Sequence, residues 1–581
     1  MSRGDRRVKR DIIALALGAA MLSPLGAAAD AGFGGEGTTA AYLIAKTAER
    51  HSAYARATAA WQVVLDGSGY SETVAESAIS NAVNAGNMRA AIALAQEFSE
   101  RGHRSQIASL ALVVGMAERE AWAEISAALE GGLSVGPLVN GLAEGWAAIG
   151  AGQRAKAEAA FDAVAATPGL TTFGLMHKAY ALGAIGDDVA AEAIWASGNH
   201  GKPLRLSRNS AFARISGLAR SGRTGAAIAV LDKLFDPADD PEAALLRAAI
   251  VAGTPPAPTI GDAKAGIAET FLAVAAALKG EATDGYTLLY TRAATHLVPD
   301  HPGALILQAQ LLGGLKLHDE ALAVWRQVPE GGSWITARLG AAEELIGLGR
   351  QDEAIGLLSQ LAATRAATGS VHLALGDALR ASGRLDEAVT AYDSAVAAAD
   401  PDEVPWRTFF ARGIALDRAG HWDEAKADLR RALDAAPEEP NILNYLGYAM
   451  AKRGEALSEA LHLVETAAAA KPDSGRIADN VGWVLHRMGL HEKAVGHLEK
   501  AVSLLPGDAA ANEHLGDGYW AVGREREARF QWRRALAFTN LPEDTARIRA
   551  KLLEGPAPAK VEEARSAEAE TSSELAATIG N

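Results

Sequence analysis

The chain has 581 residues, which is too many for one compact core and typical of a repeat array. Its formal net charge of −15 argues against nucleic acid or an anionic membrane surface as a partner. It contains no cysteine, which excludes disulfides, thiol catalysis, cysteine-ligated zinc and a cysteine-linked lipid anchor. Hydrophobic residues make up 49% of the chain, and the alanine and leucine that dominate them predict helices.

The first 29 residues have the three parts of a secretory signal in the usual order. Residues 3–10 are basic, and residues 12–22 are an apolar run that is too short to span a bilayer. Residues 27–29 are three alanines, which provide a cleavage site before Asp30. We therefore expect export, with the signal removed after Ala29. An uncleaved N-terminal anchor or a frayed amphipathic helix is the alternative interpretation.

The N-terminal half predicts helices in a degenerate repeat. Residues 30–39 are a glycine-rich linker without the Gly-Lys-Ser/Thr ending of a phosphate-binding loop. Residues 40–250 have an almost uninterrupted helical pattern, marked by a glycine with an alanine five positions later. Residues 251–262 contain three prolines and form either a surface loop or a hinge between two halves. We expect the loop, because the helical pattern resumes at once. The marker glycines are Gly86, Gly152, Gly186 and Gly222.

The repeats are clearer over residues 263–553, and clearest over 370–540. Three near-copies of one unit follow one another between Asn441 and Leu536, at steps of 34 or 35 residues. The alignment has one glycine column in the middle of the unit's first helix and a second glycine column where that helix ends. The first column is Gly447, Gly482 and Gly516, and the second is Gly454, Gly489 and Gly523.

Each unit predicts an antiparallel pair of helices. Gly447 lies in mid-helix, where a missing side chain lets a neighbouring helix approach, and Gly454 ends the helix. Ala460 opens the second helix, and Pro472 stops it. Since one pair cannot bury its apolar stripe alone, neighbouring pairs must stack. We therefore predict an all-α superhelical solenoid of antiparallel helix pairs.

The end of the chain has a different composition. Residues 543–553 predict a capping helix with a polar outer face, as the end of a solenoid requires. Residues 554–581 are rich in proline, alanine, glutamate and serine, and predict a disordered tail.

The period and the columns resemble those of the tetratricopeptide repeat (TPR) family, whose unit has ~34 residues. The resemblance is strong over about 335–540 and weak over 40–334. The runs "NYLGY", "DNVGW", "EHLGDGYW" and "ARFQWRRAL" further resemble large exported bacterial TPR proteins, some of which are adaptors of periplasmic C-terminal-processing proteases. The resemblance implies a TPR-type solenoid, degenerate in its N-terminal half, that acts as a periplasmic adaptor. Some proteins of that group are outer-membrane lipoproteins. This chain differs from them because it lacks a cysteine that could carry the lipid anchor.

No catalytic or metal-binding constellation stands out in the sequence. His491 and His497 are six residues apart and do not share a helix face, so we expect packed or solvated histidines. Paired carboxylates such as Glu343 and Glu344 have no flanking apolar pocket, and no Gly-x-Ser-x-Gly run occurs. We expect no enzyme activity, no cofactor and no metal. An enzyme hidden in residues 40–260 is an alternative that continued helix pairs would count against.

The TPR resemblance places the binding surface on the first helices of the pairs. Positions −6, −3, +1 and +4 or +5 from the mid-helix glycine share one face of each first helix. In the three clear units these positions hold amides, aromatics and charges of both signs, which suits recognition of a protein partner or peptide. The predicted binding residues are Asn441, Asn444, Tyr448, Lys452, Arg476, Asp479, Trp483, Arg487, Glu513, Asp517 and Trp520.

Two alternatives concern the tryptophans of this surface. Trp483 and Trp520 either face the partner or pack against the adjacent repeat. If they face outward they also suit sugar stacking. The alternative function is therefore a structural protein associated with envelope glycan or peptidoglycan, or one that serves polysaccharide export.

Overall fold

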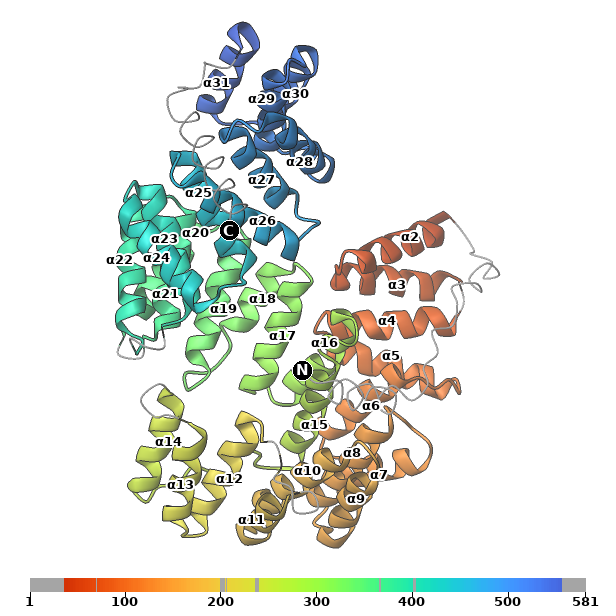
Figure 1. Ribbon diagram of the computed structural model, residues 1–581. Helices are drawn as coiled ribbons and strands as arrows, with labels where there is room; N and C mark the ends of the chain where they lie inside the picture. Colours follow the sequence, from red (N-terminus) through yellow and green to blue (C-terminus); the bar gives the residue numbers. More distant parts are fainter. Residues whose placement is uncertain are drawn as a thin grey trace. The chain divides into compact units, whose positions relative to one another are not determined.

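The computed structural model describes residues 36–68, 70–198, 204, 206–235, 240–364, 367–400 and 404–555. All regular elements in these ranges are α-helices, and neighbouring helices pack in pairs along the chain (Figure 1). The predicted all-α solenoid of stacked helix pairs is confirmed. The expected signal peptide, residues 1–29, lies outside the described residues, as does the expected tail from residue 556. None of the described helices has the length and apolar character needed to cross a membrane.

Two compact units make up the chain, Met1–Val371 and His372–Asn581. Their boundary lies within α21 (Gly369–Ala381). The helices wholly in the first unit are α2 (Glu36–Arg50), α3 (Tyr54–Ser68), α4 (Glu72–Asn84), α5 (Met88–Glu100), α6 (Gln106–Glu118), α7 (Trp122–Glu130), α8 (Pro137–Gly150), α9 (Arg154–Ala166), α10 (Thr171–Ala184), α11 (Asp188–Ser197), α12 (Arg208–Arg220), α13 (Thr224–Leu234), α14 (Pro241–Val251), α15 (Ala263–Leu278), α16 (Asp284–Leu297), α17 (Pro302–Gly314), α18 (His318–Trp325), α19 (Trp334–Gly347) and α20 (Gln351–Ala362).

The first described helix, α2, begins at Glu36, so the last four residues of the expected glycine-rich linker, 36–39, are helical. From there to α14 the described residues continue as helix pairs, which counts against a separate enzyme fold in residues 40–260. The marker glycines of the degenerate repeats each follow the end of a helix. They adopt positive φ, between 70° and 83°, which glycine reaches without a Cβ clash.

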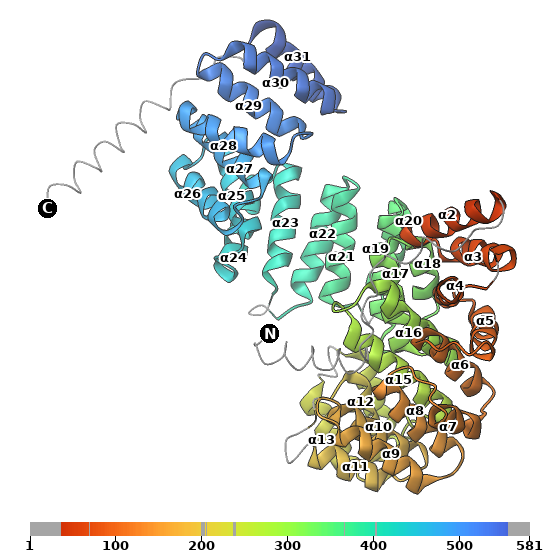
Figure 2. The same cartoon turned by 90° about the vertical axis from the view of Figure 1, so that its right-hand side faces the viewer.

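Residues 252–262 form a loop between α14 and α15. After it the chain returns to the helices that precede it. α15 packs on α8 and α10, and α16 packs on α4 and α6 (Figures 1 and 2). At Gly266 the approach is so close that a Cβ atom would lie 2.0 Å from the Trp146 ring. This return explains why the boundary between the units does not fall at the proline-rich loop.

In the second unit the repeats are regular. The complete helices are α22 (Leu385–Ala397), α23 (Trp406–Ala419), α24 (Trp422–Ala435), α25 (Pro440–Arg453), α26 (Leu457–Ala470), α27 (Gly475–Arg487), α28 (His491–Leu504), α29 (Ala509–Ala521), α30 (Glu525–Phe538) and α31 (Pro542–Glu554). The odd-numbered helices are the first members of the pairs, and we call them the inner helices.

The mid-helix glycine of each pair is required by the packing. A Cβ atom at Gly447 would lie 2.8 Å from the carbonyl oxygen of Ala460 and from the Val464 side chain. At Gly516 it would lie 2.4 Å from the Trp532 ring. In each of these pairs the backbone of the inner helix therefore packs closely against the second helix at the mid-helix glycine. The expected capping helix is confirmed as α31, which packs on α30.

Candidate functional site

Four inner helices in a row are connected by side-chain contacts. Tyr445 of α25 donates a hydrogen bond to Asp417 of α23, at 2.7 Å. Between α25 and α27, the Asn480 amide nitrogen lies 2.9 Å from the Asn444 amide oxygen. Between α27 and α29, Nδ1 of His514 lies 2.9 Å from the Asp479 carboxylate. These contacts place α23, α25, α27 and α29 side by side in chain order.

Seven of the predicted residues lie on one exposed face of α25 and α27. Asn441, Lys452, Arg476 and Arg487 are exposed, whereas Asn444, Tyr448 and Trp483 are partly buried. Their positions relative to the mid-helix glycine place them along one stripe of each helix.

Two of the amides on this stripe already have protein partners. The Asn441 amide donates to the Glu439 carboxylate at 2.7 Å, and Asn444 accepts from Asn480. Burial, together with Asp479 and Asp417, raises the pKa of Tyr448, so its hydroxyl stays neutral and available as a donor.

The other four predicted residues do not lie on an open surface. Glu513 and Asp517 of α29 are buried, because cations of α31 cover them. Lys551 contacts Glu513 at 2.7 Å and Asp517 at 2.6 Å, while Arg547 binds Glu513 through two nitrogens at 2.7 and 2.8 Å. Trp520 packs beside Trp532, with ring centroids 5.4 Å apart. The alignment treated α29 as an open first helix, but α31 occupies the position of a further inner helix beside it.

Asp479 also turns inward and is only 6% exposed. Its carboxylate binds His514, whose ring stacks on Trp483 with centroids 4.3 Å apart. Burial alone would lower the pKa of His514, but Asp479 outweighs burial and raises the pKa. The ring of His486 stacks on Trp483 as well, at 5.6 Å. Trp483 thus stacks on His514 of the next repeat, which favours the alternative in which it contacts the adjacent repeat.

Only some of the histidines near the C-terminal repeats lie close together. Nδ1 of His486 lies 3.3 Å from Nδ1 of His491. Burial first, and then the charges of neighbouring histidines, lower the pKa of His486 to about 4. His497 is exposed on α28. Among the described residues, no group of three histidine, aspartate or glutamate side chains is arranged to hold a metal ion.

The sequence alignment missed residues of α23, which continue the same stripe. Gly413 occupies the mid-helix glycine position, packed on Leu429 and Ala425. Arg407 lies six residues before it and Arg418 five residues after it, and both are exposed. The same spacing identifies Arg476, Lys452 and Arg487 in the next two repeats, so the signal was present in the sequence. We define the α23–α27 face by Arg407, Phe410, Ile414, Arg418, Asn441, Asn444, Tyr448, Lys452, Arg476, Trp483 and Arg487.

The cations of the α23–α27 face form no ion pair with any described residue. Arg418, Lys452 and Arg487 succeed one another at the same end of three inner helices, and Arg407 and Arg476 lie at the opposite end. The acid between them, Asp417, is already paired with Arg453. Between the two cationic edges lie the partly buried side chains of Phe410, Ile414, Asn444, Tyr448 and Trp483. The face therefore combines free positive charge with aromatic, aliphatic and amide groups.

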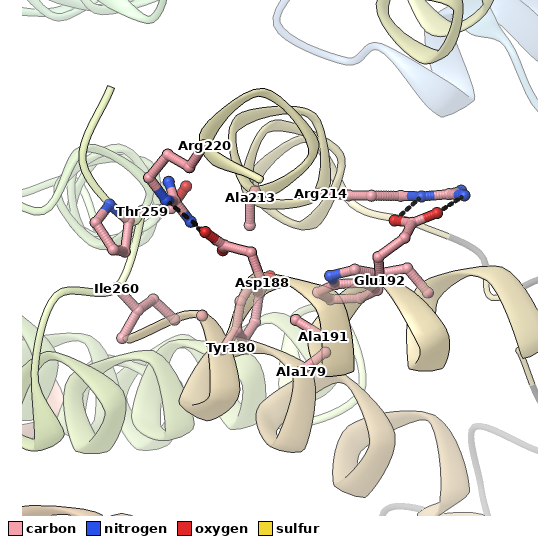
Figure 3. A pocket seen from close by; sticks show the side chains of 14 residues that line it. Ala179, Tyr180, Asp188, Ala191, Glu192, Ala213, Arg214, Arg220, Thr259 and Ile260 are labelled. Atoms are coloured by element: carbon pink, nitrogen blue, oxygen red, sulfur yellow. Dashed lines mark hydrogen bonds and ion pairs between the residues drawn. The ribbon is translucent and has the colours of Figure 1, made fainter. Parts of the chain in front are cut away.

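The first unit has a small pocket between α10, α11, α12 and the loop residues 258–260 (Figure 3). Its acidic side chains come from α11 and point toward arginines of α12 (Figure 3). Asp188 binds Arg220 at 2.6 Å, and Glu192 binds Arg214 at 2.7 Å. Both carboxylates are buried and fully paired, so the pairs join α11 to α12 and leave no charge for a ligand.

The two units differ in what covers the first helix of each pair, which is even-numbered from α2 to α12 in the first unit and odd-numbered in the second. In the first unit, α4, α6, α8 and α10 are covered by α15 and α16 of the same chain. In the second unit, α31 covers α29. Within the second unit, no described helix packs on the α23–α27 face in this way. It is the best candidate for a partner surface within the described residues.

Comparison with known proteins agrees with the repeat pattern. A family model described as "Tetratricopeptide repeat" matches residues 339–403 and 410–475. The TPR repeat-containing protein PA4667 of Pseudomonas aeruginosa is 28% identical over 198 residues, which is 34% of this chain and 33% of that protein. The match thus spans about a third of the curated relative's length.

Solved structures include similar helical chains. The structure titled "MamA MSR-1 C2" is 21% identical with a TM-score of 0.25, and covers 29% of this chain and 95% of its own. MamA from Desulfovibrio magneticus RS-1 is 19% identical, with a TM-score of 0.26 and coverage of 29% and 94%. The Cut9–Hcn1 hetero-tetramer of the APC/C is 15% identical with a TM-score of 0.38, covering 89% of this chain and 96% of that chain. At these values the likeness implies nothing about function.

Proposed function

Because the chain is a tetratricopeptide-repeat protein, we propose that it is an interaction scaffold that binds an extended segment of a partner protein along the α23–α27 face. TPR repeats generally serve as protein-interaction scaffolds, and the finer proposal concerns which surface is used. The observation that carries it is the uncovered face itself, where free cations border partly buried aromatic and amide groups.

The chemistry of the face suits an extended peptide. Aromatic side chains such as Tyr448 provide contact area, and amides such as Asn444 bridge to backbone groups of a bound segment. The cations at both edges add electrostatic attraction, which increases the association rate and fixes the orientation of a charged partner.

A glycan partner has less support from this surface. Sugar stacking needs an exposed aromatic ring, but the Trp483 ring is partly buried and already stacks with the rings of His514 and His486. Trp520 is packed against Trp532 and lies under the end of α31. A neutral glycan also would not need the free arginines and lysine. We therefore favour a protein segment as the partner.

We place this activity in the periplasm of a bacterial cell. The support is the signal-like order of residues 1–29 and the resemblance to exported adaptors. The N-terminal sequence of the mature protein tests the location. A mature chain that begins at Asp30 and is released with the periplasmic fraction is the expected result, and retention of residues 1–29 in the cytoplasm would contradict it.

Charge reversal tests the binding surface. The variant R418E/K452E/R487E reverses three exposed cations that make no ion pair with described residues, so the fold should persist. The matched control K493E/K500E/R533E makes the same change of charge on exposed positions of α28 and α30. Tagged chains are used for affinity capture from an envelope extract, followed by mass spectrometry.

We expect one or more partner proteins to be captured by the wild type and the control and lost by the first variant. The proposal is wrong if the first variant still captures the same partners to the same extent while its circular dichroism is unchanged.

A further inference from the structure

We propose that, when no partner is bound, the α23–α27 face holds the chain's own segment 556–581, which a partner must displace. The inference rests on the proposed function, since it assigns an internal competitor to the same face. It depends on three features: the charge of the segment, the place where the chain leaves α31, and the ion pairs by which α31 already covers α29.

The charge of the segment complements the charge of the face. Residues 556–581 contain five glutamates and two basic residues, which gives a net charge of −3. The α23–α27 face carries five exposed cations without ion-pair partners among the described residues. In a chain with a net charge of −15, such a face attracts the nearest acidic segment that can reach it. The glutamates are Glu562, Glu563, Glu568, Glu570 and Glu574.

The chain leaves α31 on the same side as the face. Gly555, the first residue after α31, is buried against α29, and a Cβ atom there would lie 2.6 Å from the Trp520 ring. Trp520 lies four residues after the mid-helix glycine of its helix, close to the level at which Arg487 and Lys452 lie on theirs. Gly555, the last described residue, therefore lies at the cationic end of the inner helices.

The segment is long enough to cross the face. Neighbouring helices pack ~10 Å apart, so the cationic end of α27 is about 20 Å from α31 and that of α23 about 40 Å. An extended chain covers ~3.3 Å per residue. Glu562 and Glu563 thus reach Arg487, and Glu574 reaches as far as Arg418.

The helix before this segment uses the same kind of contact with the signs reversed. On α29 the inner face is acidic, and the cations Arg547 and Lys551 of α31 cover it. On α23, α25 and α27 the inner face is cationic, and the next stretch of chain is acidic. In both cases the charge of the later stretch of chain is opposite to the charge of the inner-helix face.

The tether makes a weak contact sufficient. A short flexible linker gives an effective concentration in the millimolar range, so a segment with a dissociation constant of 0.1–1 mM as a rough range occupies the face for much of the time. A competing acidic peptide then binds about 2- to 10-fold more weakly than it would to an open face. Because the contacts are exposed ion pairs, the effect should fall at high salt.

The test measures a synthetic, fluorescein-labelled peptide of residues 556–581 by anisotropy. It is titrated with the full chain, with a chain that ends at Gly555, and with the full-length variant E562Q/E563Q/E568Q/E570Q/E574Q. We expect the peptide to bind the truncated chain and the glutamine variant about 2- to 10-fold more tightly than the full chain. The difference should disappear in 0.5 M salt.

The truncated chain is then combined with each of the two charge reversals. R418E/K452E/R487E should lose the peptide, and K493E/K500E/R533E should retain it. The inference is overturned if the truncated chain does not bind the peptide, if both charge reversals behave alike, or if the full and truncated chains have equal affinity. A full chain that forms a dimer, and becomes a monomer on truncation, would assign the segment to a second copy and also overturn it.

These results separate the inference from the proposed function. If the peptide does not bind but partner capture still depends on R418E/K452E/R487E, the internal competitor is wrong and the binding face remains. If partner capture is insensitive to that variant, the proposed function is wrong whatever the peptide does.

Discussion

Replacing Glu513 with glutamine should loosen α31 from α29 at neutral pH and leave it unchanged in acid. The Glu513 carboxylate is 4% exposed and accepts hydrogen bonds from Arg547 and Lys551. Burial opposes its ionisation, but the two cations outweigh burial and lower its pKa from 4.5 to about 2. A difference of this size corresponds to about 3 kcal/mol in favour of the docked state at pH 7.

The sign of the pH dependence follows from the lowered pKa. The contribution of Glu513 is complete above pH 4.5 and is lost as the pH falls from 4.5 toward 2, where it drops below about 0.5 kcal/mol. In Glu513→Gln, Arg547 keeps its contact with Asp544 and Lys551 keeps Asp517, so no cation is left without a partner. The variant should therefore lose about 3 kcal/mol at pH 7 and nothing measurable near pH 2.

Hydrogen exchange of the α31 amides measures this docking directly, because repeat arrays open locally from their ends. At pH 7 we expect exchange of the α31 amides in Glu513→Gln to be on the order of 100-fold faster than in the wild type. Glu525→Gln is the matched control, since Glu525 is exposed on α30 and forms no ion pair with the described residues. Equal exchange of wild type and Glu513→Gln at pH 7, or a difference that persists near pH 2, would show that the ionised Glu513 carboxylate does not hold α31 on α29.

Two further predictions concern packing and pH. Gly266→Ala should destabilise the first unit by more than ~2 kcal/mol in urea unfolding, because the new Cβ atom would lie 2.0 Å from Trp146. Gly356→Ala is the control, since a Cβ atom there would meet nothing within 4 Å. Similar unfolding curves for the two variants would contradict the packing of α15. His486 is partly buried, and this burial lowers its pKa from 6.5 to about 4, so the contribution of its neutral form to stability is complete above pH 6.5 and is lost as the pH falls toward 4. Between pH 6.5 and pH 4, the free energy of unfolding of His486→Gln should therefore fall less than that of the wild type, by up to ~3 kcal/mol. An equal pH dependence of the two proteins would argue against the burial of His486.

The helix pairs of the second unit could be predicted because their signals are local. Gly447 and Gly454 are seven residues apart, and each acts on its own helix or on the next one. The same two glycine positions then recur in each unit, at steps of 34 or 35 residues. Because each pair packs on its neighbours in the chain, the architecture follows from the repeat alone.

The return of α15 and α16 onto earlier helices could not be predicted in this way. Gly266 meets Trp146 across 120 residues of sequence, and the amide nitrogen of Asn84 reaches the carbonyl oxygen of Gly285 across 201. Neither contact has a periodic signal, since both depend on how several pairs curve together. No local pattern therefore predicted that α15 and α16 pack back on α4, α6, α8 and α10.

The burial of the proposed binding residues could be predicted only in part, for the same reason. The positions around the mid-helix glycine include the partly buried Tyr448 and the exposed Lys452. They also include Glu513 and Asp517, which are buried because α31 continues the row of inner helices. The same positions on α23 would have found Arg418, which the comparison of only three units left out.

Photo-crosslinking from the α23–α27 face shows whether an acidic segment binds there, which is what the exposed cations of this face predict. A photo-reactive phenylalanine is placed at the position of Lys452 in the full chain, and at the position of Lys493 on the outer helix α28 as the control. After irradiation in cells, the crosslinked peptides are identified by mass spectrometry. We predict crosslinks from position 452 to an acidic segment, either of a partner protein or of residues 556–581, and none of these from position 493. Absence of crosslinks from position 452, or the same products from both positions, would contradict binding of an acidic segment at this face.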